Sequence, residues 1–268
     1  MGDRKKLDVE LNNLLDLYRR VVGVRFIFDE VEFNKSKSQK VDYKIPYCVM
    51  VKSATNGHCI KVTEENFGCF ASARVLGFKE LSEKYLDGAE FMDFNMYDNI
   101  EASRKVVDNL SIVNPKPYGI ELGPISDLEK DPDIVIIVTN PYNAMRLLQG
   151  YNYYYGTYNE FRMGGMQAMC AEITANTYTS NDIKMSMMCS GTRFLSQWGR
   201  DEMSIGVPYD KFEKLVQGVF NTADPLERDG DKKRIMEAYN EDNMEGPEFN
   251  MGQNYDTGYY ELGKSGKR

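Results

Sequence analysis

The segment Asp133-Ile-Val-Ile-Ile-Val-Thr139 constrains the fold of this chain more than any other part of the sequence. Most of its residues are β-branched, and polar and apolar positions do not alternate, which predicts a strand buried on both faces. Asn140-Pro141 follows at once and predicts the start of a helix. We therefore expect an α/β or α+β fold with a mixed sheet that helices cover.

The 268 residues suffice for one large domain or two small ones. Composition changes after Thr222, where the chain becomes charged and poor in aliphatic residues. We predict a single globular domain over residues 1–222, built from two related halves at roughly 7–122 and 123–222. Residues 223–268 form a charged C-terminal extension, which is a candidate for binding a protein partner.

Charge and hydropathy exclude several classes of function. A net charge of -8 and a pI near 5.0 argue against nucleic-acid binding, which depends on clustered Lys and Arg. The longest apolar run, residues 134–138, is too short to cross a membrane. The first residues lack the apolar stretch of a secretory signal, so we expect a cytoplasmic protein whose five cysteines are reduced.

Two segments of the chain repeat one arrangement of cysteines and arginines. Cys48 is followed by an Ile-Lys-Val strand and then by Cys69-Phe-Ala-Ser-Ala-Arg74. Cys170 is followed by an Ile-Lys-Met strand and then by Cys189-Ser-Gly-Thr-Arg193. From this we infer an internal duplication with a pseudo-twofold core. Such a core would bring four thiols and two guanidinium groups towards one central site.

Three interpretations of these cysteines stay open. Cys48, Cys69, Cys170 and Cys189 are candidate ligands of an iron–sulfur cluster or another metal, because small residues after a Cys free backbone N–H groups to bond cluster sulfurs. They are also candidates for thiol catalysis or redox sensing. The third interpretation is structural, since free Cys is among the most buried residue types. No CxxC pair is present, so any ligand set would be assembled from distant segments.

A second hypothesis concerns a small-molecule ligand. Arg74 and Arg193 are candidates for binding an anionic group, and Tyr154, in the tyrosine-rich stretch 151–158, for lining an aromatic pocket. Both arginines have a structural alternative, which is pairing with an acid such as Glu80 or Glu202. No dinucleotide fingerprint and no phosphate-binding P-loop occurs in the sequence.

Several short sequences together identify a resemblance to a known family. They are Val22-Gly-Val-Arg-Phe26, Pro46-Tyr-Cys48, Gly68-Cys69 with Leu76-Gly77, Pro132-Asp-Ile-Val-Ile-Ile137 with Asn140-Pro141, Cys189-Ser-Gly-Thr-Arg193 and Ile205-Gly-Val-Pro208. Over roughly residues 7–220 the chain resembles the family catalogued as domain of unknown function 169. Phe70-Ala-Ser72 stands where members often have Pro-Gly-Gly.

The resemblance implies occurrence in archaea and bacteria, many of them anaerobes, and it implies no particular activity. We therefore expect a cytoplasmic protein of anaerobic metabolism that holds an iron–sulfur cluster or another metal on cysteines and supports redox or lyase-type chemistry. The alternative is a non-catalytic module that binds an anionic or aromatic small molecule, or a subunit that binds a partner enzyme.

Overall fold

The fold is built on one seven-stranded sheet, which the computed structural model describes together with its helices over residues 3–157 and 160–222. The strand order is β2-β3-β4-β1-β5-β7-β6, and all neighbours are antiparallel except the parallel pair β2–β3. The strands are β1 (Val22–Ile27), β2 (Gln39–Lys40), β3 (Ile60–Thr63), β4 (Gly119–Pro124), β5 (Ile134–Thr139), β6 (Lys184–Ser186) and β7 (Met203–Pro208). The expected mixed sheet is confirmed.

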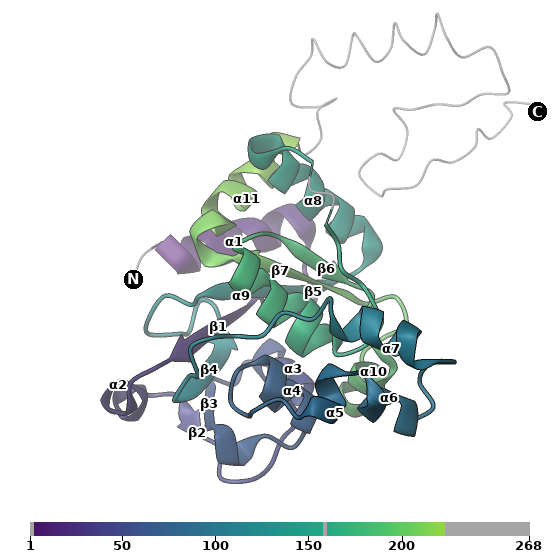
Figure 1. The fold of residues 1–268 in the computed structure, drawn as a ribbon. Coiled ribbons are helices and arrows are strands. Elements are labelled where there is room, and N and C mark those ends of the chain that lie inside the picture. Colours follow the sequence, from purple (N-terminus) through teal and green to yellow (C-terminus); the bar gives the residue numbers. More distant parts are fainter. Residues whose placement is uncertain (1–2, 158–159, 223–268) are drawn as a thin grey trace, which may run out of the picture.

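Helices cover both faces of this sheet (Figure 1). One face carries α1 (Asp3–Leu15), α8 (Pro141–Tyr155) and α11 (Tyr209–Thr222). The other face carries α3 (Tyr47–Thr55), α4 (Phe70–Val75) and the π-helix η2 (Ala168–Ala175), which continues into α9 (Asn176–Ser180). The remaining helices are α2 (Glu30–Lys35), η1 (Glu64–Asn66), α5 (Glu83–Leu86), α6 (Ala89–Asp93), α7 (Ile100–Val107) and α10 (Ser190–Ser196).

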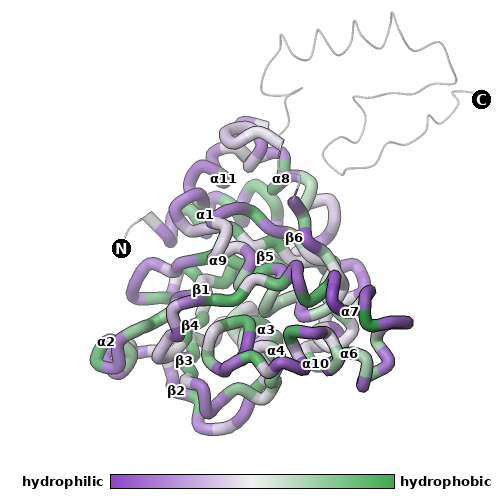
Figure 2. Tube along the Cα trace, in the orientation of Figure 1, coloured by the Kyte–Doolittle hydropathy of each residue, from purple (hydrophilic) through white to green (hydrophobic). Residues whose placement is uncertain are grey.

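Strand β5 separates the two hydrophobic cores. Ile136 and Val138 belong to the core under α3 and η2, whereas Val135 and Ile137 belong to the core under α8 and α11. All six residues of β5 are buried, so the prediction of a strand covered on both faces is confirmed. Figure 2 shows that hydrophobic residues follow the central strands while hydrophilic residues dominate the outer segments.

The strand order is the same in the two halves of the chain when it is followed outward from the β1–β5 pair. On one side β4 and β3 follow β1, and on the other side β7 and β6 follow β5, always with antiparallel pairing. Among the strands that the structure describes, only β2 lacks a counterpart. This order is the one that a duplication would produce, and the pseudo-twofold relation itself stays a prediction.

Helix α8 begins after Asn140, as the sequence predicts, and runs through the tyrosine-rich stretch as far as Tyr155. Gly150 does not end it, since this residue packs directly against Gly218 of α11. Because neither glycine has a side chain, the backbones of the two helices approach closely. The favourable packing of the two helices outweighs the low helix propensity of glycine. Gly156, with φ of 74°, ends the helix instead.

Two findings bear on the other expectations. No helix within the described ranges has the length and apolar composition needed to span a bilayer. The predicted C-terminal extension, residues 223–268, lies outside the described residues.

Candidate functional site

The four cysteines of the repeat lie on elements that contact one another across the two halves. Cys48 is on α3 and Cys170 is on η2, while Cys69 and Cys189 cap the N-termini of α4 and α10. The contacts are reciprocal: α10 of the second half packs on α3 of the first, and α4 of the first half packs on η2 of the second. Helices α3 and η2 also touch directly. Each half therefore contributes two thiols to one region.

All four cysteines line a single pocket of about 230 Å³. Its wall also contains three methionines and several aromatic and aliphatic side chains, so that sulfur and carbon make up most of its surface. The other lining residues are Tyr47, Ala71, Ser72, Phe91, Phe94, Met96, Gly165, Met166, Gln167, Met169, Ser190, Gly191, Thr192 and Leu195. The structure thus brings together the residues that the sequence repeat singled out.

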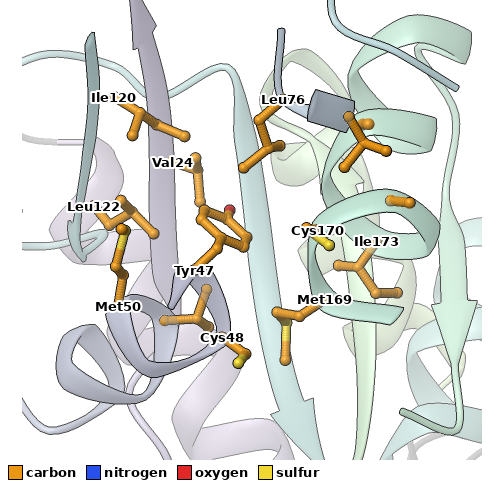
Figure 3. Close-up of a cluster of buried hydrophobic side chains, with 14 of the residues drawn as sticks. Val24, Tyr47, Cys48, Met50, Leu76, Ile120, Leu122, Met169, Cys170 and Ile173 are labelled. Atoms are coloured by element: carbon orange, nitrogen blue, oxygen red, sulfur yellow. The ribbon is translucent and has the colours of Figure 1, made fainter. Parts of the chain in front are cut away.

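Cys48 and Cys170 form the inner end of the pocket. Figure 3 shows both within one cluster of buried apolar side chains that also contains Tyr47 and Met169. Burial raises the pKa of both thiols above the ordinary value of 9.0, and negative charge on the neighbouring Cys69 and Cys189 raises it further. Both inner thiols are therefore neutral in the metal-free protein at neutral pH.

Cys69 and Cys189 are less buried than the inner pair. The backbone N–H of Thr192 donates to Sγ of Cys189 at 3.3 Å, and the Cys189 thiol in turn donates to Oγ1 of Thr192 at 3.1 Å. Ser72 Oγ donates to the backbone carbonyl of Cys69 at 2.8 Å, which fixes the first turn of α4. All five cysteines of the chain, Cys59 included, have free thiols.

A π-helix carries Cys170, and a hydrogen bond ties it to α3. Tyr47 Oη and Thr174 Oγ1 are 2.9 Å apart, and Thr174 Oγ1 donates to the carbonyl of Met169 at 2.7 Å. Burial raises the pKa of Tyr47, so this hydroxyl stays protonated. Segments of π-helix are frequent at functional sites. Nothing in the sequence of residues 168–175 indicates that this helix has π geometry.

Glu172 shapes another wall of the pocket. The residue is 3% exposed, and Oε1 accepts hydrogen bonds from the backbone N–H groups of Gly164 at 2.6 Å and Gly165 at 3.0 Å. The Ser186 hydroxyl donates to Oε2. Gly165, at φ of 65°, and the adjacent Met166 both line the pocket. Glu172 therefore fixes the loop that forms this wall.

We expect Glu172→Ala to lower the free energy of unfolding by about 2 to 4 kcal/mol, because two loop N–H groups and the buried Ser186 hydroxyl lose their acceptor. Urea denaturation followed by circular dichroism measures this change. Glu172→Gln is the matched control, since its amide oxygen still accepts from both N–H groups. An alanine variant as stable as the glutamine variant would contradict the role of the carboxylate.

The same pair of variants has an expected pH dependence. Burial is the main cause that raises the pKa of Glu172 above its ordinary value of 4.5, although Ser186 and the loop amides lower it in part. The folded state thus binds this proton more tightly than the unfolded state does. Its contribution to stability is complete below the unfolded pKa and is lost as pH rises through the folded pKa. Glu172→Gln should therefore gain stability relative to the wild type between pH 4.5 and neutral pH.

The two arginines of the repeat point away from the pocket. Arg74 Nη1 bonds both carboxylate oxygens of Glu90, at 2.6 and 2.7 Å. Arg193 Nη2 donates to the carbonyl oxygens of Met187 and Glu202, each at 2.8 Å. Both arginines therefore make structural contacts, which was the alternative to ligand binding. Arg74 pairs with Glu90 instead of Glu80, and Arg193 bonds the backbone of Glu202 instead of its carboxylate.

Tyr154 does not belong to this site either. It lies on α8, on the opposite face of the sheet, where Asn221 donates to its hydroxyl at 3.2 Å and Lys214 Nζ lies 4.9 Å from its ring centroid. The sole histidine, His58, is exposed in the turn after α3. A pocket formed by Arg74, Arg193 and Tyr154 together is therefore not present among the described residues.

Sequence reasoning missed most of the apolar wall. Phe91, Phe94 and Met96 come from a segment without a counterpart in the other half, so the repeat could not reveal them. Two adjacent glycines, Gly164 and Gly165, are the sequence signal for the tight loop in this wall. Within residues 3–157 and 160–222, no three His, Cys, Asp or Glu side chains are grouped so that they could hold a single metal ion.

Fold and site together define a mixed α/β protein with a cysteine-lined apolar pocket between its two halves. The chain belongs to the DUF169 family, described as uncharacterised ArCR, whose model matches residues 10–218. This match confirms the resemblance found in the sequence. An uncharacterised protein of Methanocaldococcus jannaschii is 24% identical over 200 residues, which cover 72% of this chain and 86% of that protein. No solved structure matches the chain.

Proposed function

We propose that the pocket holds an iron–sulfur cluster ligated by Cys48, Cys69, Cys170 and Cys189, in a cytoplasmic redox or lyase-type protein of anaerobic metabolism. The observation that carries the proposal is the convergence of four thiols, from four separate segments, on one pocket. Four cysteine thiolates are the usual ligand set of [2Fe–2S] and [4Fe–4S] clusters. Bound there, such a cluster would supply electron transfer or a Lewis-acidic iron.

The chemistry of the donor set fits a cluster better than a single ion. Thiolates are soft ligands that favour iron–sulfur clusters, zinc and copper(I). The described residues place no three such ligands about one point, whereas a cluster with several iron atoms spreads its protein ligands over a larger span. The apolar wall would exclude water, which is one of the factors that set a cluster's potential.

The protonation state of the thiols leads to an expectation about how the cluster is loaded. Ligation requires thiolates, and burial raises the pKa values of Cys48 and Cys170 in the metal-free protein. Loading the site must therefore release protons, and acidification should weaken cluster binding. The hydrogen bond from Thr192 N–H to Sγ of Cys189 already has the geometry that stabilises a ligating sulfur.

The proposal is tested by purifying the full-length protein without oxygen and measuring iron, acid-labile sulfide and visible absorption. We expect a brown protein in which iron and sulfide are present in similar amounts. A colourless preparation free of iron and sulfide, which also fails to take up a cluster when iron, sulfide and thiol are supplied, would refute the proposal.

A further inference from the structure

We propose that the outer end of the cysteine pocket binds a small, uncharged and largely apolar molecule beside the thiols. The site is the pocket of the proposed function, and the inference rests on its walls and not on the presence of iron. It names the class of ligand or substrate that this pocket admits.

The first argument is the absence of charge in the wall. Among the residues that the structure describes, none that lines the pocket is Asp, Glu, Lys, Arg or His. The two nearby arginines of the sequence repeat are bonded to Glu90 and to backbone carbonyl oxygens instead. An ionised ligand would lose its hydration here without gaining a charged side chain as a partner, at a large cost in free energy. The pocket therefore selects against carboxylates, phosphates and amines.

The second argument is that polar side chains in the wall already have partners within the protein. Gln167 accepts from Tyr85 Oη at 2.7 Å and donates to the carbonyl of Ala71 at 3.1 Å. The hydroxyls of Ser72 and Tyr47 are bonded to Cys69 and Thr174. These groups hold the wall in place and leave mostly carbon and sulfur facing the cavity. Recognition must then depend on dispersion and on contacts with soft sulfur atoms.

The third argument concerns size and access. The volume of about 230 Å³ exceeds that of engineered apolar cavities of about 150 Å³ that bind benzene. Three lining residues are also strongly exposed, Phe94 at 67%, Leu195 at 45% and Met96 at 43%. The entrance is therefore apolar as well, and an uncharged ligand meets no polar barrier between solvent and the thiols.

Methyl NMR of the full-length protein, labelled with ¹³C at its methionine methyl groups and stripped of metal with a chelator, tests the inference. Toluene and benzoate are the probes, because they have similar shapes and differ in charge. Toluene should shift the methyl signals of Met96 and Met166 saturably, and benzoate should leave them unchanged. Met145, an exposed residue of α8 on the other face of the sheet, is the control signal.

A pair of variants makes the test specific to the pocket. Leu195→Arg places a charge in the wall and should weaken toluene binding by about tenfold or more. Leu86→Arg, at a similarly exposed leucine outside the pocket, should bind toluene as the wild type does. Equal binding of benzoate and toluene, no saturable shift with toluene, or the same loss in both variants would overturn the inference.

The results separate this inference from the proposed function. Toluene binding in a protein that never takes up iron would support the ligand class and refute the cluster. If the protein contains iron and sulfide but its metal-free pocket does not bind toluene, the cluster is supported and the ligand class is overturned.

Discussion

Replacing Cys48, Cys69, Cys170 or Cys189 with serine, one at a time, should lower the iron and sulfide content of anaerobically purified protein by at least about tenfold, because losing even an outer partner of a metal ligand costs 10- to 100-fold in affinity. A serine hydroxyl is a hard donor that stays protonated at neutral pH, so it replaces a thiolate poorly. Iron and sulfide analysis, with the visible spectrum, measures the loss.

Cys59→Ser is the matched control. Cys59 precedes β3 and packs near Gly123, and it does not line the pocket. This variant should keep the full iron content. Serine at the two less buried positions, 69 and 189, should also leave the fold intact, which circular dichroism can verify. Full iron in all four pocket variants, or an equal loss in Cys59→Ser, would contradict the proposed ligand set.

Gly218→Ala should destabilise the fold more than any other single methyl group added to a glycine of α8 or α11. A Cβ at residue 218 would overlap the carbonyl oxygen of Gly150, a backbone atom that no side-chain rotation can move. The two helices must then separate and lose apolar contact. We expect a loss of about 3 kcal/mol in the free energy of unfolding, with a fall in Tm of roughly 6 to 12 °C.

Gly191→Ala supplies the comparison for this measurement. Gly191 lies in α10, and a Cβ there meets nothing within 4 Å. Alanine at this position should leave the stability unchanged or raise it by up to about 1 kcal/mol, through its higher helix propensity. Differential scanning calorimetry of both variants gives the two shifts. If Gly218→Ala melts at the wild-type temperature, the close approach of α8 and α11 is wrong.

The parts of the structure that depend on local pattern could be predicted from sequence. Strand β5 has an apolar side chain at each of the positions 134–138, because both of its faces are covered, and that uniformity is visible without a structure. Thr63 followed by two glutamates indicates a helix start, and a short 3₁₀ turn begins there, with Asn66 standing where a capping box would prefer Glu or Gln. The cysteine spacing indicated the pocket to which both halves contribute thiols.

Features that depend on contacts between distant segments could not be predicted. The sequence shows that Arg74 and Arg193 follow a cysteine, but it does not show that Glu90 and the carbonyl oxygens of residues 187 and 202 reach them first. Tyr154 attracts attention because it lies in a tyrosine-rich stretch. Its position on the opposite face of the sheet follows from the packing of α8, which the sequence does not show. Glu172 looks like any acid in a helix until its burial and its two amide donors are seen.

The reciprocal packing of α10 on α3 and of α4 on η2 makes the pocket a property of the whole chain. Either half, folded by itself, would present two thiols and an open apolar surface, with no enclosed space between them. The pocket is therefore complete only when both halves have folded and packed against each other. A cofactor or ligand that binds only the complete pocket would in turn stabilise the union of the halves, by the free energy of its own binding.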